Sequence, residues 1–516
     1  MKKINVNDIL KEFDEEIKKQ NYIPNFEIKE KKEKINIIYP LIGNFAYAHI
    51  YYDLISEELI YEVLEPELSN EEIFFLNKVK QFVLDDMYID PDKYLNSDKK
   101  SVLIEALYKY VKKFKIKINP RTFMKYYYYL WRDMLGLEKI EPLFHDIFIE
   151  DISCDGYDSP IYVYHSKFGT LKTNIYFSRE ELDKFIIKLA QKAGKHISYA
   201  EPLLDATLPD GSRINITYSQ EITTRGPTFD IRKFKKQMLS LVDLIKLNTL
   251  DIKIAAYLWT LVEYRANILV AGPTSSGKTT LLNVLSMFIP PDAKVISIED
   301  TRELQLYHEN WIPATTRKGF MIGDKYYGEI NMYTLLAESF RQNPDYVVVG
   351  EVRGEEAYVM FQGMASGHSS LSTIHADTWR SLIRRLTTPP INLPIDHVAL
   401  LDAVIFMIRA RSISPSSRRI REIIEVGKFK NEKIETEITV KWNVDEDKYE
   451  IKNLGKLIEE ELKYRKGYKK PIKDAIEEKE EIIEYLVKKN IRDQKKISDY
   501  IKLYYLDKDA LLSKIK

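Results

Sequence analysis

One short segment limits the possible folds of this chain more than any other. Residues 267–280 read Asn-Ile-Leu-Val-Ala-Gly-Pro-Thr-Ser-Ser-Gly-Lys-Thr-Thr, which matches the pattern G-x-x-x-x-G-K-[ST]. An apolar run before the glycines predicts a buried strand, and a helix-like run, residues 279–288, follows them. A strand, a glycine-rich loop and a helix in this order are typical of phosphate binding in a parallel α/β sheet.

The chemistry of each loop position supports this interpretation. Gly272 and Gly277 would let backbone N–H groups wrap a phosphate, and the helix N-terminus adds partial positive charge. Lys278 would reach the β- and γ-phosphates, and the Thr279 hydroxyl would bind Mg²⁺. We therefore expect ATP and Mg²⁺ as cofactors. The loop residues expected to hold them are Gly272, Pro273, Thr274, Ser275, Ser276, Gly277, Lys278, Thr279 and Thr280.

Two further apolar runs end in acidic residues. Residues 295–298 lead into Glu299, and residues 346–349 lead through Gly350 into Glu351. The carboxyl ends of parallel strands meet at one edge of a sheet, so both acids are expected beside the loop. One acid can hold Mg²⁺ while the other orients or deprotonates the attacking water. A helix cap or a surface carboxylate is the alternative for each acid.

Two of the eight histidines, His368 and His375, follow Gly367 within eight positions. A pair of metal ligands is one interpretation, but no third ligand with useful spacing stands nearby. A sensor of the terminal phosphate is more physical, because histidine can donate a hydrogen bond to that phosphate. Histidines whose hydrogen bonds are satisfied within the core are the alternative.

Three arginines, Arg213, Arg225 and Arg232, cluster ahead of the nucleotide-binding region. The guanidinium fork suits phosphate and neutralises charge that develops during phosphoryl transfer. An arginine delivered across a domain or subunit boundary would couple closure to hydrolysis. Surface salt bridges are the alternative.

Composition excludes several classes of protein. The 78 Lys and Arg residues balance 78 Asp and Glu residues, which argues against a protein that coats nucleic acid. The single cysteine, Cys154, excludes an intramolecular disulfide framework and a zinc site built on several cysteines. The charged first twenty residues lack the apolar core of a signal peptide, and we find no run of about 18 apolar residues. We therefore expect a cytoplasmic protein that contacts the membrane through a partner.

A basic segment, residues 101–132, combines positive charge with aromatic side chains. Its only acid is Glu105, and Tyr126 to Tyr129 and Trp131 lie between its basic residues. The basic residues are Lys109, Lys112, Lys113, Lys115, Lys117, Arg121, Lys125 and Arg132. A surface for nucleic acid or anionic lipid is one interpretation. We favour a solvated helical face whose aromatic side chains pack inward, because a local excess of charge is common.

Hydrophobic patterns divide the chain into five regions. Residues 1–139 predict an N-terminal α+β domain with helical segments, and residues 140–235 a second, smaller α/β domain. Residues 236–249 are polar enough to form a linker. Residues 250–415 alternate helix-like and strand-like runs, which is typical of a parallel sheet. Residues 416–516 predict strands followed by charged helices.

Four segments together resemble the signatures of the secretion-type traffic ATPases of type II secretion, type IV pili and archaella. GPTSSGKTT (272–280) is similar to the Walker A motif, and VISIEDTREL (295–304) to the Asp box. RQNPDYVVVGEVR (341–353) is similar to the Walker B region, and GHSSLSTIHAD (367–377) to the His box. The resemblance is closest to the archaeal branch, the ATPases of archaeal pili and of the archaellum.

The resemblance implies an α/β fold: a RecA-like phosphate-loop ATPase core preceded by smaller α+β domains, the second of them PAS-like. Residues 140–156 and 208–216 resemble that second domain. The resemblance gives catalytic roles to Lys278, Glu299, Glu351, His368, His375, Arg213 and Arg232, nucleotide contact to Arg225, and Mg²⁺ binding to Thr279 and Glu351. Whether Glu299 or Glu351 is the general base stays open.

From this resemblance we expect a homohexamer that hydrolyses ATP at the inner face of the cell membrane. It would power assembly of a type IV pilus-like filament through a polytopic membrane platform protein, without stable binding of nucleic acid. An archaellum assembly and rotation motor shares all these motifs. A DNA or protein translocation ATPase and a regulatory nucleotide-binding protein with little turnover are further alternatives.

Overall fold

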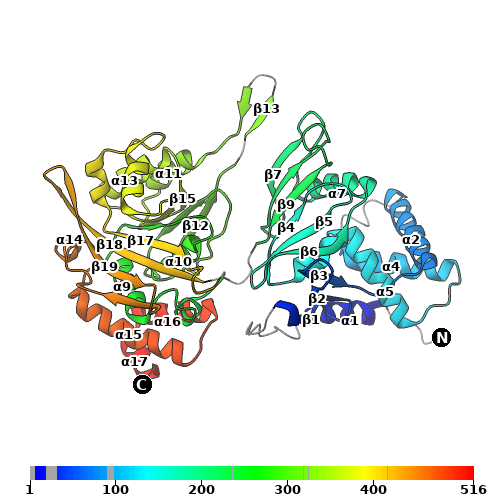
Figure 1. The fold of residues 1–516 in the computed structure, drawn as a ribbon, viewed down its shortest axis with the longest axis horizontal. Coiled ribbons are helices and arrows are strands. Elements are labelled where there is room, and N and C mark those ends of the chain that lie inside the picture. Colours follow the sequence, from blue (N-terminus) through cyan, green and yellow to red (C-terminus); the bar gives the residue numbers. More distant parts are fainter. Residues whose placement is uncertain are drawn as a thin grey trace. The chain divides into compact units, whose positions relative to one another are not determined.

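The computed structural model describes residues 6–18, 32–89, 98–234, 238–317, 319–322, 325–414 and 417–515. The chain divides into two compact units, Met1–Lys235 and Lys236–Lys516 (Figure 1). Each unit is built on one nine-stranded sheet. Within the described ranges, no helix is both long enough and apolar enough to cross a bilayer.

The first unit has a sheet of order β1-β2-β3-β6-β5-β4-β9-β8-β7. Neighbouring strands are antiparallel, except that β3 and β6 run parallel. The strands are β1 (Asn36–Ile42), β2 (Ala46–Asp53), β3 (Glu58–Leu64), β4 (Ile149–Cys154), β5 (Pro160–His165), β6 (Gly169–Tyr176), β7 (Leu203–Thr207), β8 (Arg213–Thr217) and β9 (Thr228–Arg232). The helices are α1 (Val6–Lys18), α2 (Asn70–Ile89), α4 (Lys99–Lys113), α5 (Pro120–Leu130), α6 (Glu141–His145) and α7 (Arg179–Lys192), with short turns at Lys32–Lys34, Trp131–Leu135 and Glu138–Ile140.

Alternating side chains give this first sheet one buried face. In β6, Leu171, Thr173 and Ile175 are buried, while the residues between them are exposed or half-buried. This period of two is typical of an antiparallel sheet with helices on one face. Because β3 pairs with β6, residues before and after position 139 share one sheet. A domain boundary at 139/140 stays a prediction.

The aromatic side chains of the basic segment pack inward, as the favoured interpretation predicts. Tyr126, Tyr127, Tyr128, Tyr129 and Trp131 are all at most 7% exposed. Two cations of the segment are paired: Lys125 with Glu72, and Arg132 with Glu65 and Asp133. The exposed cations of the segment are Lys109, Lys112, Lys113, Lys115, Lys117 and Arg121.

The second unit has a sheet of order β12-β11-β15-β16-β10-β17-β18-β19-β20, parallel from β12 to β17 and antiparallel beyond. Its strands are β10 (Ile268–Ala271), β11 (Val295–Glu299), β12 (Trp311–Thr315), β15 (Tyr346–Val352), β16 (Ser369–Ile374), β17 (Ala403–Arg409), β18 (Arg418–Lys430), β19 (Lys433–Asn443) and β20 (Lys448–Ile451). A separate hairpin, β13 (Phe320–Ile322) and β14 (Lys325–Tyr327), projects from this unit (Figure 1).

Helices cover both faces of the second sheet. They are α8 (Leu241–Lys246), α9 (Ile252–Glu263), α10 (Lys278–Met287), α11 (Met332–Arg341), α12 (Glu356–Ala365), α13 (Trp379–Thr387), α14 (Glu459–Leu462), α15 (Ile472–Lys488), α16 (Gln494–Leu506) and α17 (Lys508–Ile515), with a 3₁₀ turn at Ile395–Leu400. Val270 packs into the core shared with α9, α10 and α15, whereas its neighbour Leu269 packs into the core shared with α11, α12 and α13. Burial on both faces explains the uninterrupted apolar runs of these strands.

The structure differs from two of the expected divisions. Part of the expected linker is the helix α8, with Leu241, Val242 and Leu244 buried. The polar residues that suggested a linker, Ser240 and Asp243, form the capping box of this helix. Strands β18 to β20 continue the same sheet beyond residue 415, because β18 pairs along β17.

Candidate functional site

The phosphate loop, residues 272–279, joins β10 to α10 in a conformation that requires glycine at two positions. Gly272 has φ +155°, and a Cβ there would lie 2.5 Å from the carbonyl oxygen of Met407. Gly277 has φ +95° and is the N-cap of α10. Only glycine adopts such backbone readily and permits so close an approach. Within the loop, Thr274 and Ser275 are exposed, Pro273 and Thr279 half-buried, and Thr280 follows in α10.

Lys278 lies over this loop and is 7% exposed. Its Nζ donates to the carbonyl oxygen of Pro273 at 3.0 Å and lies 3.5 Å from Nδ1 of His375. Burial lowers the pKa of Lys278, and the nearby Glu351 carboxylate opposes this effect. The ammonium is therefore held at the point where the terminal phosphates of a nucleotide would develop charge.

Glu351 lies at the carboxyl end of β15, after a register shift between Val349 and Val352. Its Oε1 lies 2.8 Å from Nε2 of His375, and its Oε2 accepts a hydrogen bond of 2.6 Å from Arg353. Burial raises the pKa of Glu351, but Arg353, His375 and Lys278 outweigh it and hold the pKa below its ordinary value. An ionised carboxylate here suits Mg²⁺ binding.

Glu299, the last residue of β11, is more deeply buried than Glu351, and its pKa is shifted in the opposite direction. It is 3% exposed, and its Oε1 accepts hydrogen bonds from the N–H groups of Glu303 (2.9 Å) and Leu304 (3.0 Å). Its Oε2 is buried and has no hydrogen-bond partner. Burial raises the pKa of Glu299 to about 7. A carboxyl with this pKa can accept a proton near neutral pH, which is the requirement for a general base.

Because Gly350 has no side chain, Glu299 can pack against the backbone directly before Glu351. A Cβ at Gly350 would lie 3.0 Å from Cγ of Glu299 and force that side chain to move. Thr373 of β16 donates a hydrogen bond of 2.7 Å to the carbonyl oxygen of Gly350 and ties the two strands together here. The strand ends therefore bring Glu299 and Glu351 to one edge, as the sequence pattern predicts.

The two histidines lie at opposite ends of β16. His375 follows the strand and contacts Lys278 and Glu351, whereas His368 precedes the strand. The ring of His368 packs against Phe340, 5.0 Å between centroids, and its Nδ1 is buried without a hydrogen-bond partner. A six-residue strand separates its ends by about 20 Å. The second unit therefore brings only His375 to the phosphate loop.

The three candidate arginines lie in the first unit. Arg213 donates two hydrogen bonds to Asp205, at 3.1 Å and 2.9 Å, and Arg232 pairs with Asp151 at 3.2 Å. The carbonyl oxygen of Arg225 accepts a hydrogen bond from the N–H of Tyr157. Arg213 and Arg232 thus have the carboxylate partners that the salt-bridge alternative predicts.

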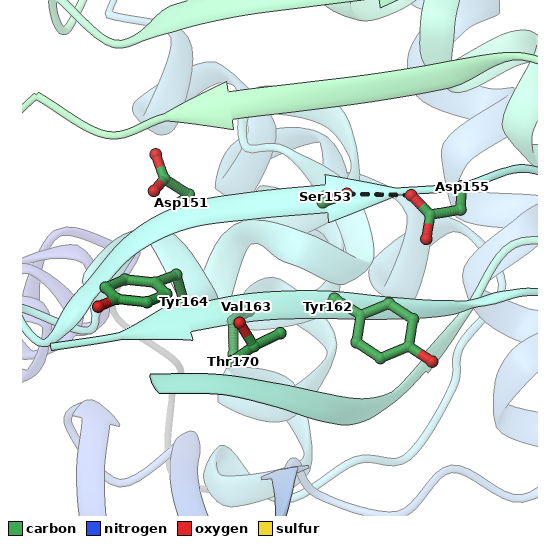
Figure 2. Close-up of a pocket in the computed structure, with 7 residues that line it drawn as sticks. All are labelled: Asp151, Ser153, Asp155, Tyr162, Val163, Tyr164 and Thr170. Carbon is green, nitrogen blue, oxygen red and sulfur yellow. Dashed lines mark hydrogen bonds between the residues drawn. The ribbon is translucent and has the colours of Figure 1, made fainter. Parts of the chain in front are cut away.

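A cavity of about 350 Å³ lies on the sheet of the first unit beside Asp151 (Figure 2). Residues of β4, β5 and β6 line it, and the Ser153 hydroxyl donates a hydrogen bond of 3.1 Å to Asp155 (Figure 2). None of the lining residues is a candidate predicted from the sequence, although the candidate Arg232 pairs with Asp151 at its edge.

The residues of the second unit fit a nucleoside triphosphate and Mg²⁺. The glycine cradle leaves room that a Cβ would fill, and Lys278 is aimed over it. The Ser276 hydroxyl is buried without a partner, as Glu299 Oε2 is. Buried polar atoms without partners are rare unless a ligand or water completes them. Thr279 and Glu351 are the residues available to hold Mg²⁺.

Two arginines of this site escaped the sequence reasoning. Arg353 binds Glu351 and lies 3.8 Å from Asp300, and its place two residues after Glu351 was an available signal. Arg418 donates a hydrogen bond of 3.2 Å to the carbonyl oxygen of Ser275. Arg418 reaches the loop from a strand 143 positions later, so no local pattern could have indicated it.

The chain is similar to a known family and to several known proteins. The family described as "Type II/IV secretion system protein" matches residues 157–496. An uncharacterised protein of Methanocaldococcus jannaschii is 34% identical over 94% of this chain and 92% of its own length. The probable conjugal transfer protein TrbB of Sinorhizobium fredii is 28% identical over 48% of this chain and 75% of its own length. The VirB11 ATPase of the Brucella suis type IV secretion system shares 25% identity, with a TM-score of 0.28, over 55% of this chain and 92% of that one.

Proposed function

Because this chain belongs to the type II/IV secretion system protein family and is an ATPase of that family, we propose that it powers the assembly of a type IV pilus-like surface filament. The observation that carries the ATPase part of this proposal is the contact series from Lys278 through His375 to Glu351 beside a glycine-lined phosphate loop. His375 thus connects the Lys278 ammonium, which would bind the γ-phosphate, to the Glu351 carboxylate of β15.

Each residue of the site has a role in hydrolysis. Lys278 neutralises charge that develops on the terminal phosphates, and Glu351 with Thr279 holds Mg²⁺, which offsets charge on the phosphate oxygens when bound. Glu299 takes the proton of the attacking water, because its pKa of about 7 and its unpartnered oxygen suit a base. His375, between Lys278 and Glu351, registers loss of the γ-phosphate through those contacts.

The first unit and the cell membrane complete the proposed machine. We place the chain in a homohexamer at the inner face of the membrane, where it acts on a polytopic platform protein. Arg213 and Arg232 of the first unit contribute to catalysis, and Arg225 contacts nucleotide. Asp205 and Asp151 then have to release Arg213 and Arg232, respectively, before the guanidinium groups can bind phosphate.

A translocation ATPase is the second candidate function, favoured by the similarity to the conjugal transfer protein TrbB. The archaellum assembly and rotation motor remains a third, because it shares the same motifs. The three candidates require the same phosphate-loop chemistry. They differ in which cellular structure is lost when turnover stops.

Chromosomal Lys278→Ala in the native cells tests the proposal. We expect loss of one thin, non-rotating pilus type in electron micrographs, with the protein level unchanged on an immunoblot. Lys441→Ala, at an exposed position on β19, is the matched control and should keep all filaments. Loss of swimming filaments would favour the archaellum motor. Survival of every filament would contradict the assembly role and favour DNA or protein transport.

A further inference from the structure

Two arginines lie directly opposite each other beside the phosphate loop. Arg409 ends β17 and Arg418 begins β18, and the two are register partners in this antiparallel pair. Residues directly opposite in a sheet share a face, so two guanidinium groups are placed side by side. Two like charges in such a pair destabilise a sheet unless an anion lies between them.

Arg418 contacts the loop itself. Its Nε donates to the carbonyl oxygen of Ser275 at 3.2 Å, and a Cβ at Gly277 would lie 3.5 Å from its Cγ. The same position would lie 3.5 Å from Cε of Met407. Met407 and Arg409 are two residues apart on β17 and therefore share a face. Arg409 and Arg418 thus face the side of the sheet that carries the phosphate loop and the N-terminus of α10.

Arg409 has hydrogen-bonding capacity that the protein does not fill. Its Nε is buried and has no hydrogen-bond partner. Among the residues that the structure describes, no Asp or Glu oxygen lies within 4.0 Å of its guanidinium nitrogens. Arg409 is half-buried, and a buried donor such as its Nε is costly when it lacks an acceptor. A ligand that brings negative charge would complete the arrangement.

The order of the strands indicates which part of the nucleotide is near these arginines. β10 lies between β16 and β17. His375 and Glu351 follow from β16 and β15, on one side of β10, whereas Arg409 and Arg418 lie on the other side. The catalytic acids mark the γ-phosphate end. The arginines are therefore placed toward the nucleoside end.

We propose that Arg409 and Arg418 bind the α-phosphate of the nucleotide, with Arg418 also bracing the loop at Ser275. This inference rests on the proposed ATPase site. A guanidinium pair matches a phosphate that carries charge in both ATP and ADP. The pair therefore sets the affinity for both nucleotides, whereas Glu351 and His375 distinguish ATP from ADP.

Calorimetric titration of the full chain with Mg-ADP and with a non-hydrolysable Mg-ATP analogue tests this assignment. Arg409→Ala should weaken the binding of both nucleotides by the same factor, at least about tenfold, because one charge-assisted contact to the shared phosphate is lost. Arg418→Ala should do the same, and Arg409→Lys should lose less because it retains the charge. Arg409→Ala is decisive, since only Arg418 is shown bracing the loop.

Arg421→Ala is the matched control. Arg421 lies on the same strand as Arg418, but its guanidinium stacks on Phe406, which belongs to the opposite core, and it bonds Glu422. This variant should bind both nucleotides as the unchanged chain does. Unchanged binding by a folded Arg409→Ala chain, with its thermal unfolding midpoint retained, would overturn the assignment, as would a loss confined to the ATP analogue. Failure of the unchanged chain to bind either nucleotide would instead overturn the proposed ATPase site.

Discussion

Each unit of this protein buries a cluster of polar side chains, and the two clusters differ in how completely they are bonded. The Asp146 cluster of the first unit comprises Tyr39, Tyr61, Asp146 and His165. Asp146 accepts a hydrogen bond of 2.6 Å from each tyrosine hydroxyl, and its second oxygen accepts from the N–H of Phe148 at 2.8 Å. His165 accepts from two backbone N–H groups and lies 3.3 Å from Tyr39. None of its described side-chain atoms is buried without a partner.

The phosphate-loop cluster of the second unit comprises Ser276, Lys278, Glu299, Glu351 and His375. Here the Ser276 hydroxyl and Glu299 Oε2 are buried without partners. A bound nucleotide or water would supply partners for these two atoms. In the phosphate-loop cluster, unfilled hydrogen-bonding capacity coincides with a glycine-lined loop and a buried lysine, and this combination distinguishes it from the fully bonded Asp146 cluster. Substitutions in the two clusters should therefore have different consequences.

Lys278→Ala should give the largest effect. Removing the ammonium leaves charge on the terminal phosphates unbalanced, so the rate of ATP turnover should fall at least about a thousandfold. The far-ultraviolet circular dichroism spectrum and the unfolding midpoint should stay close to those of the unchanged chain. Normal turnover by this variant would contradict the site.

Asp146→Ala should affect stability and leave chemistry alone. It leaves the hydroxyls of Tyr39 and Tyr61 buried and unpaired, which should lower the free energy of unfolding of the first unit by about 3 kcal/mol. Denaturant unfolding measures this loss. Turnover by the folded protein below its unfolding transition should be unchanged. A fall in turnover as large as that of Lys278→Ala would remove the distinction between the clusters.

Glu299→Gln sharpens the assignment of the general base. The amide keeps the shape of the side chain but cannot take a proton, so turnover should fall about a hundredfold while nucleotide affinity changes little. Glu351→Gln, the matched change, should instead weaken Mg²⁺ binding, so that turnover requires a higher Mg²⁺ concentration. The opposite pattern in steady-state kinetics would exchange the two roles.

Lowering the pH should change the stabilities of the two units in opposite directions. Burial lowers the pKa of His165 to about 4, so the unfolded chain binds this proton more readily and the first unit loses stability as pH falls from about 6.5. Burial raises the pKa of Glu299 to about 7, so the folded second unit binds the proton more readily and gains stability as pH falls through this value. Between pH 7 and pH 5 each effect is about 2 kcal/mol.

Hydrogen exchange of the full chain at pH 7 and pH 5, corrected for intrinsic rates, measures this divergence. Protection should fall across β1 to β6 and rise across β10, β11 and β15. In Glu299→Gln the rise in the second unit should disappear, while the fall in the first unit stays. Parallel changes in both units would show that these two groups do not control the pH response.

Sequence reasoning predicted the parts of this site that lie close together along the chain or at strand ends. The phosphate loop has a local pattern, and Glu299 and Glu351 follow apolar strands whose ends must meet in a parallel sheet. His368 is different. Its spacing of seven from His375 suggested one pair, but the residues between them form a strand, which separates its ends instead of joining them.

Contacts between distant segments could not be predicted in the same way. Arg409 and Arg418 meet because β17 and β18 pair, and the loop reaches Arg418 through a backbone carbonyl that any residue could supply. The polar segment before residue 250 looked like a linker because capping residues and linker residues have similar composition. The first sheet shows the same limit, since β3 and β6 join residues more than a hundred positions apart.

That join between β3 and β6 determines where this protein can be cut. Asn174 of β6 bonds both the N–H and the carbonyl oxygen of Val63, at 2.9 Å and 3.1 Å, beside the parallel pairing. A fragment that begins at residue 140 would expose β6 as an open edge with these groups unpaired. Such an edge is a template for pairing between molecules. We therefore expect a chain without its first 139 residues to associate through this edge, and a shortened chain made for crystallisation should retain them.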